Sequence, residues 1–188
     1  ILQSLDAANA YLADDYDKKL ASFTAKLDAL KSSLTAQGFS LYGNESLKLT
    51  IEPKSYGYTG DELAEVLKKS GIVCEFYDAD YVVMMFTPEM GEAVLEKARK
   101  ALADIPRRAP INECAPVFAR AERAMSIREA MLAPSEVVDV CDARGRVLAD
   151  AGVSCPPAIP IVMCGEVIND EQIRLFKYYG IRAERVVK

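Results

Sequence analysis

The residues best suited to chemistry are one thiol and one carboxylate in the proline-rich segment 154–166. Cys155 precedes Pro156, and Glu166 follows Gly165 at the far end of the segment. Each proline fixes its own φ and keeps the residue before it extended, so the segment is expected to be stiff and non-helical. A stiff segment that holds a carboxylate and a thiol in fixed places suits the wall of a binding site. On local physics alone, a structural crossover with a surface glutamate and a packed thiol is the simpler interpretation.

Histidine is absent from the sequence, and its absence narrows the possible reactions. The chain therefore lacks the commonest general base and any Ser-His or Cys-His nucleophile pair. The five cysteines are scattered and include no C-x-x-C pair, so neither a zinc site nor a disulfide framework is predicted. If the protein is an enzyme, its central chemistry is not expected to lie in these 188 residues alone.

Charge and hydropathy argue against two classes of partner. With a net charge of −5 and a pI near 5.0, the chain lacks the excess of Lys and Arg that nucleic-acid binding requires. No apolar run approaches the about 20 residues of a membrane-spanning helix, and the acidic first segment is unlike a signal peptide. We therefore expect a cytoplasmic protein with no nucleic-acid or membrane partner. Its length of 188 residues allows one large or two small domains.

The elements that must position these residues begin with a long amphipathic helix. Apolar residues recur at spacings of three and four, which predicts one helix from Ser4 to about Gln37, ended by Gly38. Thr59 and Glu62 have the spacing of a capping box. The other elements expected in this half are a strand at 47–52, a helix at 60–70, strands at 72–77 and 81–86, and a helix at 87–105. Together they predict a small α/β layer with a mostly antiparallel sheet.

A linker with three prolines, within residues 105–116, precedes a second set of elements. Ser126 and Glu129 again have the spacing of a capping box, and Asn169 is placed to cap the last helix. The elements expected here are a strand at 136–140, a helical turn at 141–144, a short buried strand at 161–163, a helix at 170–179 and a strand at 181–187. The predicted fold class is therefore α/β (α+β), with two small layered domains.

A series of short motifs resembles one known family. The motifs are Gly57-Tyr-Thr-Gly-Asp-Glu-Leu-Ala64, Tyr81-Val-Val-Met-Met-Phe-Thr-Pro88, Ile105-Pro-Arg-Arg108, Met125-Ser-Ile-Arg-Glu-Ala130, Pro156-Pro-Ala-Ile-Pro160 and Gly165-Glu166. In this order they resemble the C-terminal part of the bacterial ornithine/lysine/arginine decarboxylases, which are pyridoxal-phosphate enzymes of the aspartate-aminotransferase fold. The resemblance implies a linking helix and an aminotransferase-like small domain at 1–106, and the family's C-terminal domain at 107–188.

The resemblance also implies what these residues lack. The family holds its cofactor through a lysine in a Ser-x-His-Lys motif, which a sequence without histidine does not contain. We therefore expect a fragment that is inactive alone, binds no pyridoxal phosphate, and works with an upstream cofactor-binding domain of the same protein. The intact enzyme is expected to self-associate as a homodimer or larger oligomer.

The implied reaction is the decarboxylation of lysine, arginine or ornithine, in which the cofactor takes up the electrons left by CO₂. Glu166 is then expected to line the substrate channel and to bind the cationic end of the substrate, with Cys155 as a second wall residue. Departures from the commonest family pattern at Cys155, Ala158 and Cys164 leave the wall chemistry open. Two alternatives stay open: a non-catalytic interaction or regulatory module of the same fold, and a subunit completed by a separate cofactor-binding chain.

Overall fold

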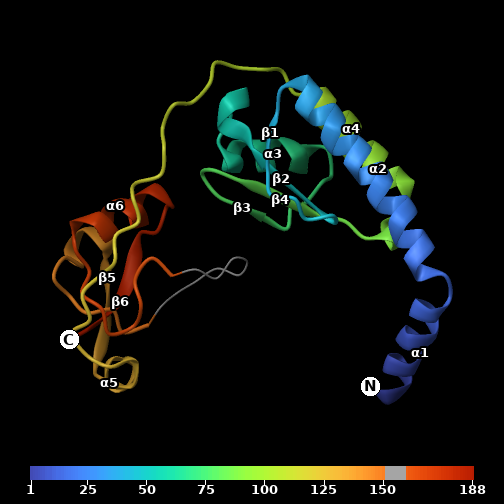
Figure 1. Cartoon of the computed structure of the whole chain (residues 1–188). Helices are drawn as coiled ribbons and strands as arrows, with labels where there is room; N and C mark the ends of the chain where they lie inside the picture. Colours follow the sequence, from blue (N-terminus) through green and yellow to red (C-terminus); the bar gives the residue numbers. More distant parts are fainter. Residues whose placement is uncertain (151–159) are drawn as a thin grey trace. The chain divides into compact units, whose positions relative to one another are not determined.

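The computed structural model describes residues 1–150 and 160–188, which form two compact units, Ile1–Asn112 and Glu113–Lys188 (Figure 1). Cys155 and the rest of residues 154–159 of the proline-rich segment therefore lie outside the described residues. Helices combined with small antiparallel sheets confirm the predicted α+β class. No helix in the described part of the chain has the length and apolar character needed to cross a membrane.

The N-terminal region contains two helices, α1 (Leu2–Ala13) and α2 (Tyr16–Gln37), so the prediction of one helix over 4–37 is wrong. The break lies at Asp15, whose φ of 54° is in the left-handed region. Aspartate tolerates this region better than most residues because its short polar side chain bonds locally, here to Lys18. Helix α1 buries no side chain, whereas α2 buries the apolar stripe Phe23, Leu27, Leu30 and Leu34 and ends at Gly38 as expected.

The first unit is built on a four-stranded antiparallel sheet with the order β1-β2-β4-β3. Its strands are β1 (Ser40–Tyr42), β2 (Lys48–Glu52), β3 (Phe76–Tyr77) and β4 (Val82–Met85). The expected strand at 47–52 is confirmed, β3 and β4 are shorter than expected, and β1 was not predicted.

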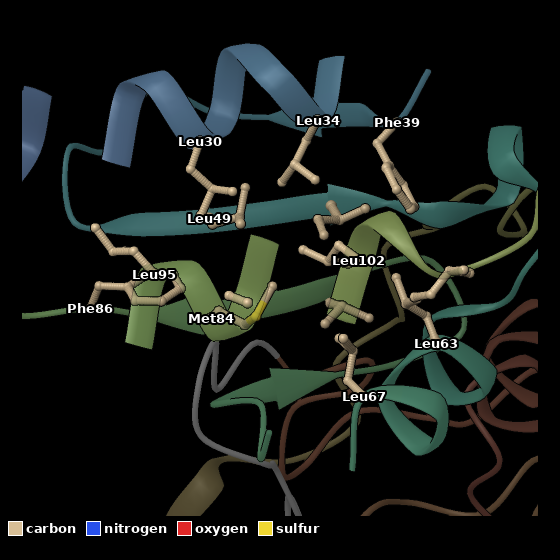
Figure 2. Packing of buried hydrophobic residues seen from close by; sticks show 14 of the residues in the cluster. Leu30, Leu34, Phe39, Leu49, Leu63, Leu67, Met84, Phe86, Leu95 and Leu102 are labelled. Carbon is tan, nitrogen blue, oxygen red and sulfur yellow. The ribbon is translucent and has the colours of Figure 1, made fainter. Parts of the chain in front are cut away.

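Helices α2 and α4 (Glu92–Ala103) lie side by side and supply much of the core (Figure 1). Leu30 and Leu34 of α2 point toward Leu49 of β2 (Figure 2). Helix α3 (Gly60–Lys69) adds Leu63 and Leu67, which are fully buried in the same cluster. Burying apolar side chains from all three helices on one sheet accounts for the stability of this unit.

The local signals for helix starts are confirmed at Thr59 and corrected at Thr87. Thr59 and Glu62 form both hydrogen bonds of a capping box at the start of α3. The helix expected from residue 87 is instead a 3₁₀ turn, η2 (Pro88–Met90), followed by α4. Gly91, at a φ of 72°, separates the two because a left-handed residue interrupts helical hydrogen bonding.

Residues 105–111 are bound to the first unit. Tyr58 donates a hydrogen bond to the Pro106 carbonyl at 2.8 Å, and the Arg108 and Ile111 amides donate to residues of the 3₁₀ turn η1 (Pro53–Tyr56). A Cβ at Gly57 would lie 2.5 Å from the Arg108 Cβ, so glycine makes this close approach possible. These contacts explain why the unit ends at Asn112, whereas the domain boundary was predicted after residue 106.

The second unit contains a two-stranded antiparallel sheet flanked by short helices (Figure 1). Its elements are α5 (Ile127–Leu132), β5 (Ser135–Asp139), η3 (Val140–Asp142), α6 (Asp170–Tyr178) and β6 (Ala183–Val187). Val140, Leu148, Ile168, Phe176 and Val186 lie in its core. The predicted caps at Ser126 and Asn169 are both confirmed.

The prediction of a buried strand at 161–163 is wrong. Residues 161–165 form bends and turns, and pairing resumes only as isolated bridges of Glu166 with Arg123 and of Val167 with Val147. Gly165 adopts a φ of 91° and turns the chain directly after this apolar run.

Candidate functional site

An open pocket of about 370 Å³ lies in the second unit and includes the predicted residue Glu166. Its lining residues are Arg123, Ser126, Ile127, Arg128, Met163, Cys164 and Glu166. They come from two stretches of chain, 123–128 and 163–166, that are distant in sequence. The pocket therefore exists only when these stretches are folded against each other.

Backbone hydrogen bonds hold the two stretches together. The Gly165 carbonyl accepts from the Ala124 amide at 2.9 Å and the Met125 amide at 3.1 Å. Arg123 and Glu166 are paired as an isolated antiparallel bridge, which places both side chains on the same face of the backbone pair. The two side chains form no ion pair with each other in the described structure.

Glu166 is held by the turn that contains it. Its amide donates to the Met163 carbonyl at 3.0 Å, and its Oε2 accepts from the Met163 amide at 2.9 Å. Within the described residues, Oε1 accepts no hydrogen bond. The half-buried carboxylate is thus oriented through one oxygen and has the other open to a ligand.

Gly165 is required by the geometry of this turn. Its φ is 91°, and an added Cβ would lie 2.5 Å from the Met125 carbonyl oxygen. Both features exclude a side chain, because L residues rarely adopt this φ and the opposing atom belongs to rigid backbone. The residue before Glu166 therefore fixes where the carboxylate points.

The first turn of α5 forms another part of the wall and is fixed by its capping box. Glu129 Oε2 accepts from the Ser126 amide at 2.9 Å and from its hydroxyl at 2.7 Å. These bonds, with a smaller contribution from the Arg123 charge, lower the pKa of Glu129. Ile127 and Arg128 follow the cap directly, so their positions on the pocket rim are set by it.

Two arginines that sequence reasoning did not select also line the pocket. Arg123 uses Nε to donate to the Met125 carbonyl at 3.2 Å, which leaves its terminal nitrogens unbonded in the described structure. Arg128 is exposed and makes no hydrogen bond or ion pair with any described residue. The only sequence signal was the position of Arg128 inside the Met125–Ala130 motif.

Cys164 lines the pocket as a packed thiol. The residue is buried, and its Sγ donates to the Ala149 carbonyl at 3.0 Å. Burial, assisted by the Asp150 charge, raises the pKa of the thiol. A neutral thiol is a poor nucleophile, so Cys164 serves packing here.

The pocket does not fit pyridoxal phosphate as a covalent site. None of its lining residues is a lysine, which is the residue that forms a Schiff base with this cofactor. The described residues likewise contain no cluster of three or more Cys, Asp or Glu side chains that could hold a metal.

Comparison with known proteins places this pocket in a recognised domain. Residues 114–186 match the family model described as Orn/Lys/Arg decarboxylase, C-terminal domain. Both predicted site residues, Cys155 and Glu166, and the whole pocket lining fall within this match.

The curated relatives extend the similarity to most of the chain. An arginine decarboxylase of Bacillus subtilis is 30% identical over 92% of the chain, and one of Halalkalibacterium halodurans is 31% identical over 92%. The chain spans 39% of the length of each. A third relative, the uncharacterised protein YaaO of Bacillus subtilis, is 26% identical over 93%.

Solved structures support the fold. The constitutive lysine decarboxylase of Escherichia coli matches all of the chain and 43% of its own, with a TM-score of 0.70 and 15% identity. The lysine decarboxylase of Francisella novicida matches 96% of the chain and 40% of its own, with a TM-score of 0.63 and 13% identity. At these identities the likeness establishes the fold and nothing about substrate.

Proposed function

Residues 114–186 form a C-terminal domain of the Orn/Lys/Arg decarboxylase type, and from this premise we propose that the chain is part of a decarboxylase of basic amino acids. The substrate would be arginine, lysine or ornithine, converted to the corresponding amine and CO₂. Similarity to two arginine decarboxylases over 92% of the chain supports this proposal. We place the reaction in the cytoplasm and the intact enzyme in a homodimer or larger assembly.

The relatives are much longer than this chain, which supports the proposal that cofactor binding belongs to another part of the protein. Because 188 residues correspond to 39% of an arginine decarboxylase, most of such an enzyme lies in other residues. We assign the first unit to the linking helices and small domain, and the second to the C-terminal domain. An upstream domain of the same protein would bind pyridoxal phosphate, which supplies the electron sink for decarboxylation.

Within that enzyme, the second unit would line part of the substrate channel. The observation that best supports this role is that Glu166 lines an open pocket, with one carboxylate oxygen bonded to a backbone amide and the other without a hydrogen bond from any described residue. A carboxylate oriented in this way binds the cationic end of a basic amino acid by a charge-assisted hydrogen bond. Cys155 stays a proposed second wall residue.

The test is CO₂ release by the full product of the gene that encodes these residues. The product is supplied with pyridoxal phosphate and assayed with L-arginine, L-lysine and L-ornithine. Release from one of the three supports the proposal. A product that binds the cofactor and releases no CO₂ favours the non-catalytic module. A product without cofactor that gains activity with a separate cofactor-binding chain supports the two-chain alternative.

A further inference from the structure

The sheet of the second unit has an open edge along strand β5. Strand β6 is flanked on both sides, because it pairs with β5 and also bonds to residues 147–149. Strand β5 pairs with β6 and with no other strand in the part of the chain that the structure describes. The outer side of β5 is therefore the edge of this sheet.

The backbone groups on this edge can be identified from the bonds at the two ends of β5. The Pro134 carbonyl and the Val140 amide each form a hydrogen bond of 2.9 Å with a residue that flanks β6. Backbone groups point to alternate sides along a strand, so the even-numbered residues of β5 bond to β6. The amides and carbonyls of Ser135, Val137 and Asp139 point the other way, and no described residue bonds to them.

The features that usually protect a sheet edge are missing from β5. Proteins protect open edges with very short strands, lysine, proline or β-bulges, because an open edge pairs readily with another chain. The outer strands of the first unit, β1 and β3, have only three and two residues. Strand β5 has five residues, Ser-Glu-Val-Val-Asp, and an unbroken register with β6. Its central residue, Val137, is 58% exposed.

We propose that β5 pairs with β5 of a second copy of this chain, in antiparallel orientation about a twofold axis at Val137. In this register, Val137 lies opposite the partner's Val137, and Ser135 lies opposite the partner's Asp139. The outward amides and carbonyls of both strands then bond to each other, and the two sheets join into one of four strands. The inference goes beyond the proposed function and does not depend on decarboxylase activity.

Charge complementarity favours a second copy as the occupant. The Arg185 side chain lies on the same face as Ser135, and its Nη1 donates to the Ser135 Oγ at 3.5 Å. Pairing brings the partner's Asp139 opposite Ser135, next to this guanidinium. The twofold axis repeats the same contact at the other end of β5, so each copy supplies one cation and one carboxylate.

Charge also selects the register. An axis at Glu136 or at Asp139 places two identical carboxylates directly opposite each other, which is destabilising. An axis at Val138 places Val137 opposite the partner's Asp139 and loses the contact between the two Val137 side chains. The axis at Val137 therefore combines an apolar contact at the centre with complementary charges at both ends.

The strength of the contact follows from its size. Pairing of five residues from each copy buries much less than the about 1,200 Å² of total surface that a stable interface needs. We therefore expect the isolated chain to dimerise only at about 0.1 mM or above. In an assembly that already holds two copies together, the same contact forms at a higher effective concentration.

The first test is sedimentation velocity of the 188-residue chain from about 10 µM to about 1 mM. We expect the average mass to rise from monomer toward dimer. Val137→Lys places two lysines opposite each other and should weaken dimerisation by at least about tenfold. The matched control is Val73→Lys, because Val73 is 86% exposed in the first unit. It should dimerise like the wild type.

A cross-linking experiment locates the contact. The background carries Cys114→Ser and Cys141→Ser, which removes the two exposed thiols. Val137→Cys should form an intermolecular disulfide on mild oxidation, since opposed Cα atoms in a pair lie about 5.5 Å apart. Ala183→Cys is the control, because Ala183 is exposed on β6. Its two copies are at least about 14 Å apart across three strand spacings, so no disulfide should form.

Amide hydrogen exchange distinguishes a second copy from another segment of the same protein. Protection of the Val137 amide that increases with protein concentration supports pairing between copies. Protection that is equal at about 10 µM and about 1 mM indicates that the edge is covered within one molecule, and it would overturn the proposal.

Three other results would also overturn it: a monomer at every concentration, equal dimerisation of the wild type and Val137→Lys, or equal cross-linking of Val137→Cys and Ala183→Cys. None of these results bears on CO₂ release by the full gene product. Failure of this inference is therefore distinguishable from failure of the proposed decarboxylase activity.

Discussion

Arg123 and Glu166 face each other across a single antiparallel bridge, and both line one pocket. The two stretches of chain are held together by the Gly165 carbonyl, which accepts hydrogen bonds from the two backbone amides that follow Arg123. The two side chains form no ion pair with each other in the part of the chain that the structure describes.

The first prediction concerns Gly165. Gly165→Ala should lower the free energy of unfolding by about 1–3 kcal/mol, because the residue is left-handed and its new Cβ would meet the Met125 carbonyl. Urea denaturation measures the change. Gly145→Ala is the matched control, since Gly145 has a φ of 74° with open space around it. An equal decrease in the free energy of unfolding in both variants would mean that the contact of the new Cβ with the Met125 carbonyl does not destabilise the fold.

The second prediction concerns Glu184, which is 8% exposed and faces the core of the second unit. Burial, with a smaller effect of Asp150, raises its pKa. A carboxyl with a raised folded-state pKa binds its proton more tightly when folded, so the ionised form destabilises the fold at neutral pH. Stability should rise as pH falls through this folded-state pKa, until the unfolded carboxyl also protonates near about pH 4.3.

Glu184→Gln should therefore melt at a higher temperature than the wild type at pH 7. The difference should vanish as the pH falls toward 4, since protonated glutamate and glutamine are both neutral. Thermal unfolding from pH 4 to 8 measures it. A less stable Glu184→Gln protein at pH 7 would contradict this account and indicate a favourable partner for the carboxylate.

The third prediction concerns Gln172, which is fully buried in α6. Its Nε2 donates to the Ala119 carbonyl at 2.8 Å, and its Oε1 accepts from the Asn169 amide at 3.2 Å. Gln172→Met should lower the free energy of unfolding by about 1–3 kcal/mol, because it leaves both backbone groups without this partner. The exposed neighbour Glu171→Gln should change it by less than about 0.5 kcal/mol. An unchanged free energy of unfolding in Gln172→Met would contradict the stabilising role of these two hydrogen bonds.

The fourth prediction concerns thiol reactivity. Cys164 is buried with a raised pKa, whereas Cys141 is exposed. Iodoacetamide should therefore modify Cys141 much faster than Cys164 in the folded protein, because the thiolate is the nucleophile. Peptide mass spectrometry separates the two sites. Comparable rates in native buffer, with equal rates in urea as the reference, would contradict the packed position of Cys164.

Sequence reasoning succeeded where the determinant is local. The caps at Thr59, Ser126 and Asn169 depend on side chains two or three residues away, and all three are confirmed. The helix break at Asp15 was missed because the apolar spacing continues across it, although α1 buries nothing. The spacing of apolar residues indicates which face of a helix can be buried. It does not show where a single residue with left-handed backbone geometry interrupts the helix.

The site shows the same limit. Glu166 was selected because it ends a stiff segment, and it lines a pocket, whereas Cys155 lies outside the described residues. Arg123 and Arg128 were missed because their link to Glu166 depends on Gly165 packing against Ala124 and Met125. Such pairing between distant stretches leaves no periodic trace in the sequence.

The most direct test of the account is the kinetics of Glu166→Gln in the full gene product, with CO₂ release as the readout. The account predicts that KM for the basic amino acid rises about tenfold while kcat changes little, because Glu166 binds substrate away from the reacting carbon. Glu171→Gln, an exposed change outside the pocket, should match the wild type. An unchanged KM in Glu166→Gln would contradict the proposed role of this pocket.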